Sequence, residues 1–511
     1  MKRTTWLVSF AAAAVTACTQ ATPEQQIIND AAAALGGRDR ILAVKTLVIE
    51  GTGANGNLGQ DMTPAATSQA FNLTGYKRAV DVAAGRARVE QTRTPNFTYF
   101  QGQAPQKQVL GIAGDVGYNV AANGNATRVS NAVAKDRRAE IYHHPLTIVR
   151  AALDPTAKLT RPRTVDNQSV VDVTTASGLA FTLAIDGTTK LPARVVSMAD
   201  NPNLGDVAIE TSFTDYQDVS GLKLPAHLTT KTDTVTTTDI RATKQTVDGD
   251  AGDLAAPAAA ASAAPVAGPP PATVTSEELA KGVWFLGGQS HHSVLVEFAD
   301  HLELIEAPQN DALAMARFEA IRKTIPNKPV RYVINTHHHF DHAGGLRAAV
   351  AEGATIISHG LNQQFYEKVV QLPHTLNPDR LAKEPKKANI EYVGTVFGAG
   401  RDERELTDGK RKMEIYRVAG SQHADAMLIG YLPAEKILVE ADLFTPQAAP
   451  VATAARPPEA GAGAGGGGLI VNPGPRNLYD NIQRLKLQVE TIAPLHGSVV
   501  KMAELLKLLG V

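Results

Sequence analysis

Cysteine is almost absent from this chain, in which Cys18 is the single cysteine among 511 residues. One cysteine cannot form a disulfide within the chain, and it cannot build a zinc site from several thiolates. An excess of charge of one sign is also absent, since 50 lysine and arginine residues face 51 aspartate and glutamate residues. No block of like charge occurs either, so we expect no nucleic-acid partner.

Long apolar runs are missing, apart from a short one near the N-terminus. A basic start precedes residues 6–17, which are too few for a comfortable membrane span. They end in Val15-Thr16-Ala17-Cys18, which resembles a bacterial lipobox, although an ordinary secretory signal is the alternative interpretation. The resemblance implies that residues 1–17 are a lipoprotein signal peptide and that Cys18 carries a lipid anchor. We therefore expect a periplasm-facing lipoprotein of the bacterial cell envelope, and Thr19 after the cysteine favours the outer membrane.

Changes of composition divide the chain into segments. A chain of 511 residues is expected to form two or more domains. Residues 251–274 are rich in alanine and proline, which predicts a semi-rigid linker. We expect a polar tether at 18–26, one domain at 27–250 and a second at 275–511. Residues 446–468 are rich in glycine, alanine and proline, which predicts a disordered loop inside the second domain.

The first domain has mostly the pattern of strands separated by glycine, asparagine and aspartate turns. One helix is expected at 27–35 and another at about 137–152, which Pro145 should split. The composition predicts a long, mostly antiparallel sheet with few helices. Two phrases, at 187–193 and 221–225, resemble periplasmic lipoprotein-carrier and receptor domains. That resemblance implies an antiparallel half-barrel wrapped around a helix.

The second domain alternates strands with helices. A hairpin is expected at 282–298, further strands at 330–334 and 355–357, and helices at 311–324 and 344–352. This alternation predicts α/β layers, so the whole chain is expected to be an α+β protein of two domains.

One segment of the second domain concentrates side chains that bind metals. A predicted strand runs into Asn335-Thr-His-His-His-Phe-Asp-His342. In an extended chain, residues i and i+2 point the same way, so His337 and His339 can hold one cation. The following turn brings Asp341 and His342 towards a second cation. Crowding such polar groups at a strand end is costly unless they are paired, which favours a metal site.

With this motif, the region from about 278 to 511 resembles the metallo-β-lactamase superfamily, whose αββα sandwich binds metals at the edge of two sheets. The resemblance implies three further ligands, and His423, Asp442 and His496 match them in order and spacing. The full implied ligand set is His337, His339, Asp341, His342, His423, Asp442 and His496.

The ligand set predicts the chemistry. Nitrogen and carboxylate ligands without thiolates suit two zinc ions, with iron and manganese as alternatives. Two such ions lower the pKa of a shared water from 15.7 towards about 7, which gives hydroxide at neutral pH. Asp341 is the candidate catalytic residue, because it can orient that nucleophile and shuttle its proton. We expect a metallo-hydrolase acting on a small ester, lactone, thioester or phosphodiester.

Two other functions stay open. One is a carrier lipoprotein whose first domain binds an apolar ligand, with a secondary metallo-domain. The other is a true β-lactamase, although β-lactamases of this superfamily have cysteine or serine where this chain has Asp442. A redox di-iron protein is disfavoured, because such relatives carry a flavin domain. No Gly-x-Gly-x-x-Gly motif in a strand-to-helix turn and no flavodoxin-like segment is recognisable here.

Several residues near the motif are candidates for supporting roles. His291 and His292 lie at the predicted hairpin turn and can contact substrate, and His359 can support the ligands from a neighbouring strand. The superfamily pattern has an aspartate at a strand end, and this aspartate is missing here. Glu306 lies one position before the place of that aspartate and can supply the carboxylate in its stead. The sequence makes no prediction of the oligomeric state.

Overall fold

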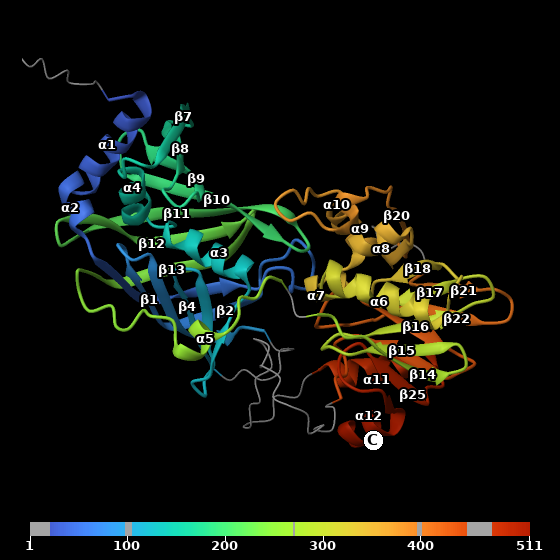
Figure 1. Ribbon diagram of the computed structural model, residues 1–511. Coiled ribbons are helices and arrows are strands. Elements are labelled where there is room, and N and C mark those ends of the chain that lie inside the picture. Colours follow the sequence, from blue (N-terminus) through green and yellow to red (C-terminus); the bar gives the residue numbers. More distant parts are fainter. Residues whose placement is uncertain (1–20, 98–104, 269–270, 396–400, 447–472) are drawn as a thin grey trace, which may run out of the picture.

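The computed structural model describes residues 21–97, 105–268, 271–395, 401–446 and 473–511 (Figure 1). Cys18 and all but the first residue of the predicted loop at 446–468 lie outside the described residues. Within the described part of the chain, none of the helices combines the length and apolar character that a membrane crossing requires.

The first helix, α1 (Pro23–Leu35), begins earlier than the sequence predicts. The Thr22 hydroxyl accepts a hydrogen bond from the Gln25 amide, and the Gln25 side chain accepts one from the Thr22 amide. This capping box, with proline at the first helical position, starts a helix four residues before the expected one. The tether prediction is therefore wrong for residues 23–26, whose polar composition belongs to a helix start. A short helix that the sequence did not predict, α2 (Arg38–Ala43), follows.

The N-terminal region is built on one long antiparallel sheet, as the sequence predicts, and this sheet has thirteen strands among the described residues. Strands β1 to β6 follow one another from the middle of the sheet to one edge. Strand β7 lies at the opposite edge, and β8 to β13 follow from there back to the middle. The first and last strands therefore pair in the middle of the sheet, with Leu47 opposite Val247. The strands are β1 (Thr46–Gly56), β2 (Ala70–Asp81), β3 (Arg86–Pro95), β4 (Gln106–Ala113), β5 (Val116–Val120), β6 (Ala126–Arg128), β7 (Lys158–Val165), β8 (Gln168–Thr174), β9 (Ala180–Asp186), β10 (Pro192–Asn201), β11 (Gly205–Val219), β12 (Leu222–Thr232) and β13 (Val235–Val247).

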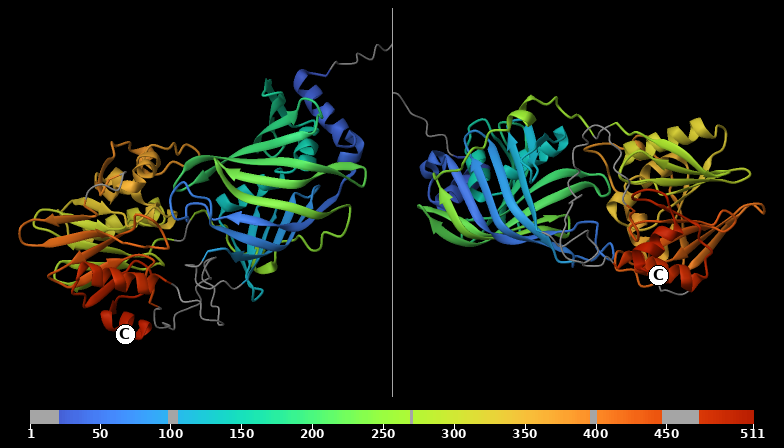
Figure 2. Two further views of the ribbon diagram at one scale, coloured as in Figure 1. Left: turned by 180° about the vertical axis from the view of Figure 1, so that it is seen from behind. Right: turned by 90° about the horizontal axis from the view of Figure 1, so that it is seen from below.

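Helices cover one face of this curved sheet (Figures 1 and 2). The predicted helix at 137–152 is split, as expected from Pro145, into α3 (Asn131–Ile141) and α4 (Pro145–Ala152). The apolar side chains of α1 and α4 share a core with β1 and β8 to β12, while α3 packs on β2 to β4. Residues 258–262, in the predicted linker, form the short helix α5 (Ala258–Ser262).

The C-terminal region contains two facing sheets (Figure 1). The first sheet begins with an antiparallel meander and continues with parallel strands. The predicted hairpin at 282–298 and the predicted strands at 330–334 and 355–357 are confirmed, whereas the strands at 275–280 and 389–393 were not predicted. Its strands are β14 (Thr275–Ala280), β15 (Val283–Gly287), β16 (Ser293–Glu297), β17 (Leu302–Ile305), β18 (Val330–Ile334), β19 (Thr355–His359) and β20 (Asn389–Val393). The second sheet contains β21 (Glu403–Thr407), β22 (Lys412–Arg417), β23 (Leu428–Leu432), β24 (Ile437–Glu440), β25 (Thr491–Pro494) and β26 (Val500–Lys501).

Alternation along the strands assigns each side chain of the first sheet to one of two cores. Val294 and Val296 belong to the core between the sheets, whereas Leu295 belongs to the core under the helices. Helices α6 and α8 cover the first sheet, and α11 and α12 pack on the second, which gives the predicted αββα layers. The helices of this region are α6 (Asp311–Thr324), α7 (Phe340–Ala343), α8 (Leu346–Glu352), the 3-10 helix η1 (Gly360–Asn362), α9 (Gln363–Val369), α10 (Arg380–Lys383), α11 (Gly474–Leu485) and α12 (Met502–Leu509).

Candidate metal centre

The structure brings the seven predicted ligands together at one edge of the two sheets. Strand β18 ends at Ile334, and the chain enters a buried segment in which His337 and His339 are fully inaccessible. Helix α7 then carries Asp341 and His342. The other three ligands come from the second sheet: His423 lies between β22 and β23, Asp442 follows β24 and His496 follows β25. Three groups of side chains could each hold a metal ion, because the ligand atoms within each group lie within 4.8 Å of one another. The groups are His337, His339 and His423; His291, Asp341, His342 and His496; and His337, His342 and Asp442.

Asp442 lies between the first two of these groups. Its Oδ2 is 2.7 Å from His342 Nε2 and 3.5 Å from the Nε2 atoms of both His337 and His423. Its Oδ1 is 3.2 Å from His496 Nε2. One carboxylate thus faces histidines of both groups, a position from which it could bridge two cations.

The backbone at Asp442 is strained towards this position. Its φ of 61° lies in the left-handed region, which is uncommon for residues other than glycine and concentrates at functional sites. The fully buried Glu440 carboxylate accepts hydrogen bonds from the amides of Leu443 and Phe444 and so holds the turn. Burial and the neighbouring Asp442 raise the pKa of Glu440 to about 8.

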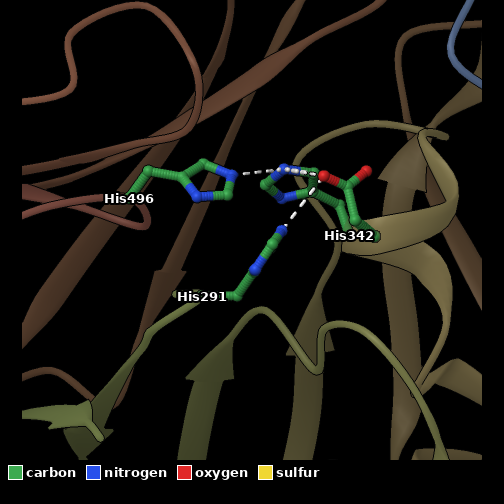
Figure 3. Close-up of side chains that lie close together, drawn as sticks. His291, His342 and His496 are labelled. Carbon is green, nitrogen blue, oxygen red and sulfur yellow. Dashed lines mark hydrogen bonds and ion pairs between the residues drawn. The ribbon is translucent and has the colours of Figure 1, made fainter. Parts of the chain in front are cut away.

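The outer nitrogens of two histidines fix which ring atom faces the centre. His342 Nδ1 donates to Glu306 Oε2 at 3.1 Å, and His496 Nδ1 donates to the Ser290 carbonyl at 3.1 Å. In the neutral rings the proton therefore lies on Nδ1, and Nε2 keeps its lone pair. The two Nε2 atoms face each other at 3.1 Å (Figure 3). Two lone pairs at this distance repel each other unless a cation or a proton lies between them.

The charges around these rings also favour a cation. Burial opposes protonation of His342, but Asp442 and Asp341 raise its pKa well above the usual value, so the site stabilises positive charge. By contrast, burial and the neighbouring imidazoles hold the pKa of His337 well below its usual value, which keeps that ring neutral and able to ligate. The donor set of imidazole nitrogens and carboxylate oxygens without sulfur fits zinc or a similar divalent cation.

Glu306 supports the ligand segment. It follows β17, is fully buried and has a φ of 74°. Its carboxylate accepts hydrogen bonds from the Asn335 amide, from Thr336 Oγ1 at 2.6 Å and from His342 Nδ1. The structure thus places Glu306 in the supporting position that the sequence suggested for it. Carboxylates that orient ligating imidazoles are a recurring feature of metal sites.

His291 lies closer to the ligands than the sequence indicated. Its Nε2 is 3.0 Å from Asp341 Oδ2, and its Nδ1 faces the Gln309 side-chain amide at 2.9 Å. Since an amide N–H only donates, the His291 proton lies on Nε2 and is donated to Asp341. The backbone of His291 also forms an isolated bridge with His496. His291 can therefore orient Asp341.

Two other candidates lie outside the three ligand groups. The His292 ring packs on Phe285, with 4.8 Å between ring centroids. The His359 Nδ1 accepts from the Leu361 amide, and its Nε2 faces Asp402. Neither side chain belongs to a group of potential ligands in the described part of the chain, so the structure does not bring them to the centre.

Sequence reasoning missed two contributors from the N-terminal region. The Gln60 amide donates to Asp341 Oδ1 at 2.7 Å, and the Asp61 carbonyl accepts from His339 Nε2 at 2.9 Å. Nothing in their local sequence marks them as part of a site, because the contact spans about 280 residues of chain.

The fold and the site thus define a two-sheet α/β region with a cluster of histidines and aspartates that could bind metal ions. Residues 305–368 match the model of the metallo-beta-lactamase superfamily. The matched segment carries His337, His339, Asp341 and His342. Members of this superfamily are generally hydrolases.

Among solved structures, the chain is similar to a metallo-beta-lactamase from Pontibacter korlensis, with 17% identity over 47% of this chain and 98% of that one and a TM-score of 0.32. It is also similar to the mono-zinc form of the metallo-beta-lactamase FIM-1 from Pseudomonas aeruginosa, with 18% identity over 47% and 94% of the chains and a TM-score of 0.33. A metallo-beta-lactamase from Hirschia baltica has 20% identity over 46% and 94% of the chains and a TM-score of 0.30. No curated protein matches the chain.

Proposed function

We propose that the protein is a metal-dependent hydrolase with two divalent cations, zinc in the first instance, held by the seven predicted ligands. The facing Nε2 atoms of His342 and His496, each with its proton fixed on Nδ1, are the observation that carries the proposal. Only a positive charge between them makes this arrangement favourable, and the adjacent Asp442 supplies the counter-charge.

Bound cations of this kind activate water at neutral pH and stabilise the negative charge that develops on a carbonyl or phosphoryl oxygen. The chain's own residues position the reactants. Asp341 is the more accessible of the two ligand carboxylates, with 37% of its side chain exposed against 19% for Asp442. Its Oδ2, already 3.0 Å from His291 Nε2, can take a proton from the attacking water and pass it on. His291 then keeps the carboxylate aligned throughout.

The substrate class follows from Asp442. A bridging carboxylate adds negative charge and bulk between the two groups of histidines, which leaves little room for a bicyclic amide. We therefore expect esters, lactones, thioesters or phosphodiesters to be better substrates than β-lactams.

Metal analysis of the wild type tests the proposal, together with a screen of ester, lactone, thioester, phosphodiester, sulfate-ester and β-lactam substrates. We expect about two metal ions per chain, and activity that a chelator abolishes and zinc or manganese restores. His337→Ala should lose the first ion and His496→Ala the second. His292→Ala is the matched control, because that ring lies outside the ligand groups. Metal-replete wild type that holds no metal would overturn the proposal.

A second candidate function is binding of an apolar ligand by the N-terminal region. A cavity of about 470 Å³ lies against its sheet. Apolar side chains such as Ile112, Leu228 and Ile240 line it, together with the charged Arg78 and Glu140. Ala139→Phe on the cavity wall should weaken binding of a fluorescent fatty acid, whereas Val165→Phe, on an exposed strand, should not. Equal binding by both variants would exclude the cavity as the binding site.

The cellular location belongs to the same proposal, with Cys18 as a lipidated N-terminus in the bacterial envelope. Cys18→Ala should then leave an unprocessed or soluble protein instead of one in the membrane fraction. Unchanged migration and fractionation of this variant would contradict the lipid anchor.

A further inference from the structure

Residues 57–69, here called the β1–β2 loop, leave the N-terminal sheet and contact the metal-binding segment of the C-terminal region. The carbonyl of Gly59 accepts from the Phe340 amide at 3.1 Å, and that of Met62 accepts from the Asp425 amide at 2.8 Å. Between these two contacts lie Gln60 and Asp61, which reach the ligands themselves. The loop thus contacts Phe340, which follows His339, and Asp425, which lies two residues after His423.

We propose that the β1–β2 loop is a positioning element of the metal centre, so that the N-terminal region completes a site whose ligands all come from the C-terminal region. This inference rests on the proposed function, because it takes His339 and Asp341 as ligands. It adds two positioning residues, Asp61 and Gln60, and a reason for the two regions to occur in one chain.

Asp61 acts through the tautomer of His339. A carbonyl oxygen only accepts hydrogen bonds, so the contact at 2.9 Å places the His339 proton on Nε2. Nδ1 is then the atom that offers a lone pair to a cation. This selection is the opposite of that at His342 and His496, whose protons lie on Nδ1. An acceptor on the outer nitrogen both orients a ligating ring and raises its basicity.

The side chain of Asp61 keeps its own carbonyl in place. Asp61 is 3% exposed, and its carboxylate accepts hydrogen bonds from the Met62 amide, the Gln69 amide and Ser68 Oγ at 2.7, 2.7 and 3.0 Å. These bonds close the loop on itself, so its backbone is set before it meets His339.

Gln60 acts on the carboxylate of Asp341. Its amide donates to Oδ1, while His291 donates to Oδ2. One oxygen is therefore held from each region of the protein, which fixes the plane of the carboxylate. A carboxylate free to rotate would present either oxygen, at variable distance, to the second cation and to the attacking water.

The N-terminal region packs closely against Phe340, which fixes the position of the β1–β2 loop relative to the ligands. Gly59 has a φ of 72°, and a Cβ there would lie 2.3 Å from the Phe340 ring, so only glycine allows the approach. On the other side, Asn203 Nδ2 donates to the Phe340 carbonyl at 3.1 Å. The backbone of Phe340, between His339 and Asp341, is thus held by two segments of the N-terminal region.

The test uses full-length protein with Asp61→Ala, Asp61→Asn or Gln60→Ala, and Thr67→Ala as the control on the exposed part of the same loop. Zinc affinities are measured by competition with a chromophoric chelator, and ligand geometry by the visible spectrum of the cobalt-substituted protein. We expect Asp61→Ala and Gln60→Ala to weaken zinc binding by about 10- to 100-fold and to change the cobalt spectrum. Asp61→Asn should restore part of the affinity, and Thr67→Ala should match the wild type.

The tautomer gives a readout that does not depend on metal. In metal-free protein labelled with ¹⁵N-histidine, the signal lost in His339→Gln should show the proton on Nε2, and Asp61→Ala should change it. Variants that bind two zinc ions with wild-type affinity and spectrum would overturn the role of the loop. A wild type without metal but with this tautomer would overturn the proposed function and leave the contact of the loop standing. A proton on Nδ1 of His339 in the wild type would overturn the inference directly.

Discussion

Glu306 is the residue on which the second group of ligands depends. It orients His342 through Nδ1 and fixes Thr336 at the start of the ligand segment. We predict that Glu306→Ala weakens zinc binding by about 10- to 100-fold, as is typical for loss of a carboxylate behind a ligating imidazole. Competition titration measures the effect, with the exposed Glu319→Gln as control. Equal affinities of the variant and the control would refute the role given to Glu306.

A second single residue, Asp442, is expected to determine which substrates the site accepts. We predict that Asp442→Ser retains the fold, binds metal more weakly, and raises the rate on β-lactams relative to esters, because a serine removes a charge between the two groups of histidines. Rates on one penicillin and one ester, measured for both proteins, check the ratio. Wild-type cleavage of penicillins faster than of every ester tested would show that the argument from Asp442 is wrong.

Glu303 makes stability depend on pH, away from the metal centre. Burial raises its pKa from 4.5 to about 8. As pH rises from 4.5 to 8, the unfolded chain releases this proton while the folded protein keeps it, so stability falls across that window. Glu303→Gln removes this penalty, and we predict that its urea midpoint gains on that of the wild type between pH 5 and pH 8. A constant difference between the two midpoints would argue against a neutral Glu303.

At the scale of elements, the sequence predicted what is local or periodic. The strand before Asn335, the helix of residues 311–324 and the break at Pro145 follow from alternation, helical spacing and the geometry of proline. The ligand set was accessible because four members lie within six residues and the others fit a known order. Gln60 and Asp61 were not accessible, because their role exists only after two distant segments meet.

Helix α1 illustrates a local signal that composition concealed. Polar residues before Ile27 suggested a tether, although Thr22 and Gln25 form a capping box there. We predict that Thr22→Ala destabilises the N-terminal region by about 1 kcal/mol, because the first turn loses its side-chain acceptor. Urea denaturation measures the loss, and Thr67→Ala, at an exposed threonine of the β1–β2 loop, serves as the control. A midpoint equal to that of the control would mean that the capping box contributes nothing to stability.

At the scale of the whole molecule, a second contact joins the regions. The Asp206 carboxylate accepts from the amides of Thr375 and Leu376, and the Asp206 amide donates to the Pro373 carbonyl. Burial opposes ionisation, but the hydrogen bonds from Thr375 and Leu376 outweigh it and lower the Asp206 pKa, so the acceptor stays charged at neutral pH.

We predict that Asp206→Ala loosens the contact between the regions while leaving each one folded. Calorimetry should show the unfolding transitions of the two regions further apart than in the wild type, because a shared contact couples them. Asp218→Ala, in an exposed ion pair on the same strand, is the control. A calorimetric trace of the Asp206 variant identical to that of the control would show that this contact does not couple the regions.

The pairing of β1 with β13 has a mechanical consequence. The two strands run antiparallel, so the start of β1 and the end of β13 lie at the same end of the pair. A force that pulls these two chain ends apart loads the hydrogen bonds between the strands sequentially, starting with the pair at this end, and not all at once. If the N-terminus is fixed and the C-terminal region is pulled, the sheet will therefore begin to open at its centre, between Leu47 and Val247, while its outer strands stay paired.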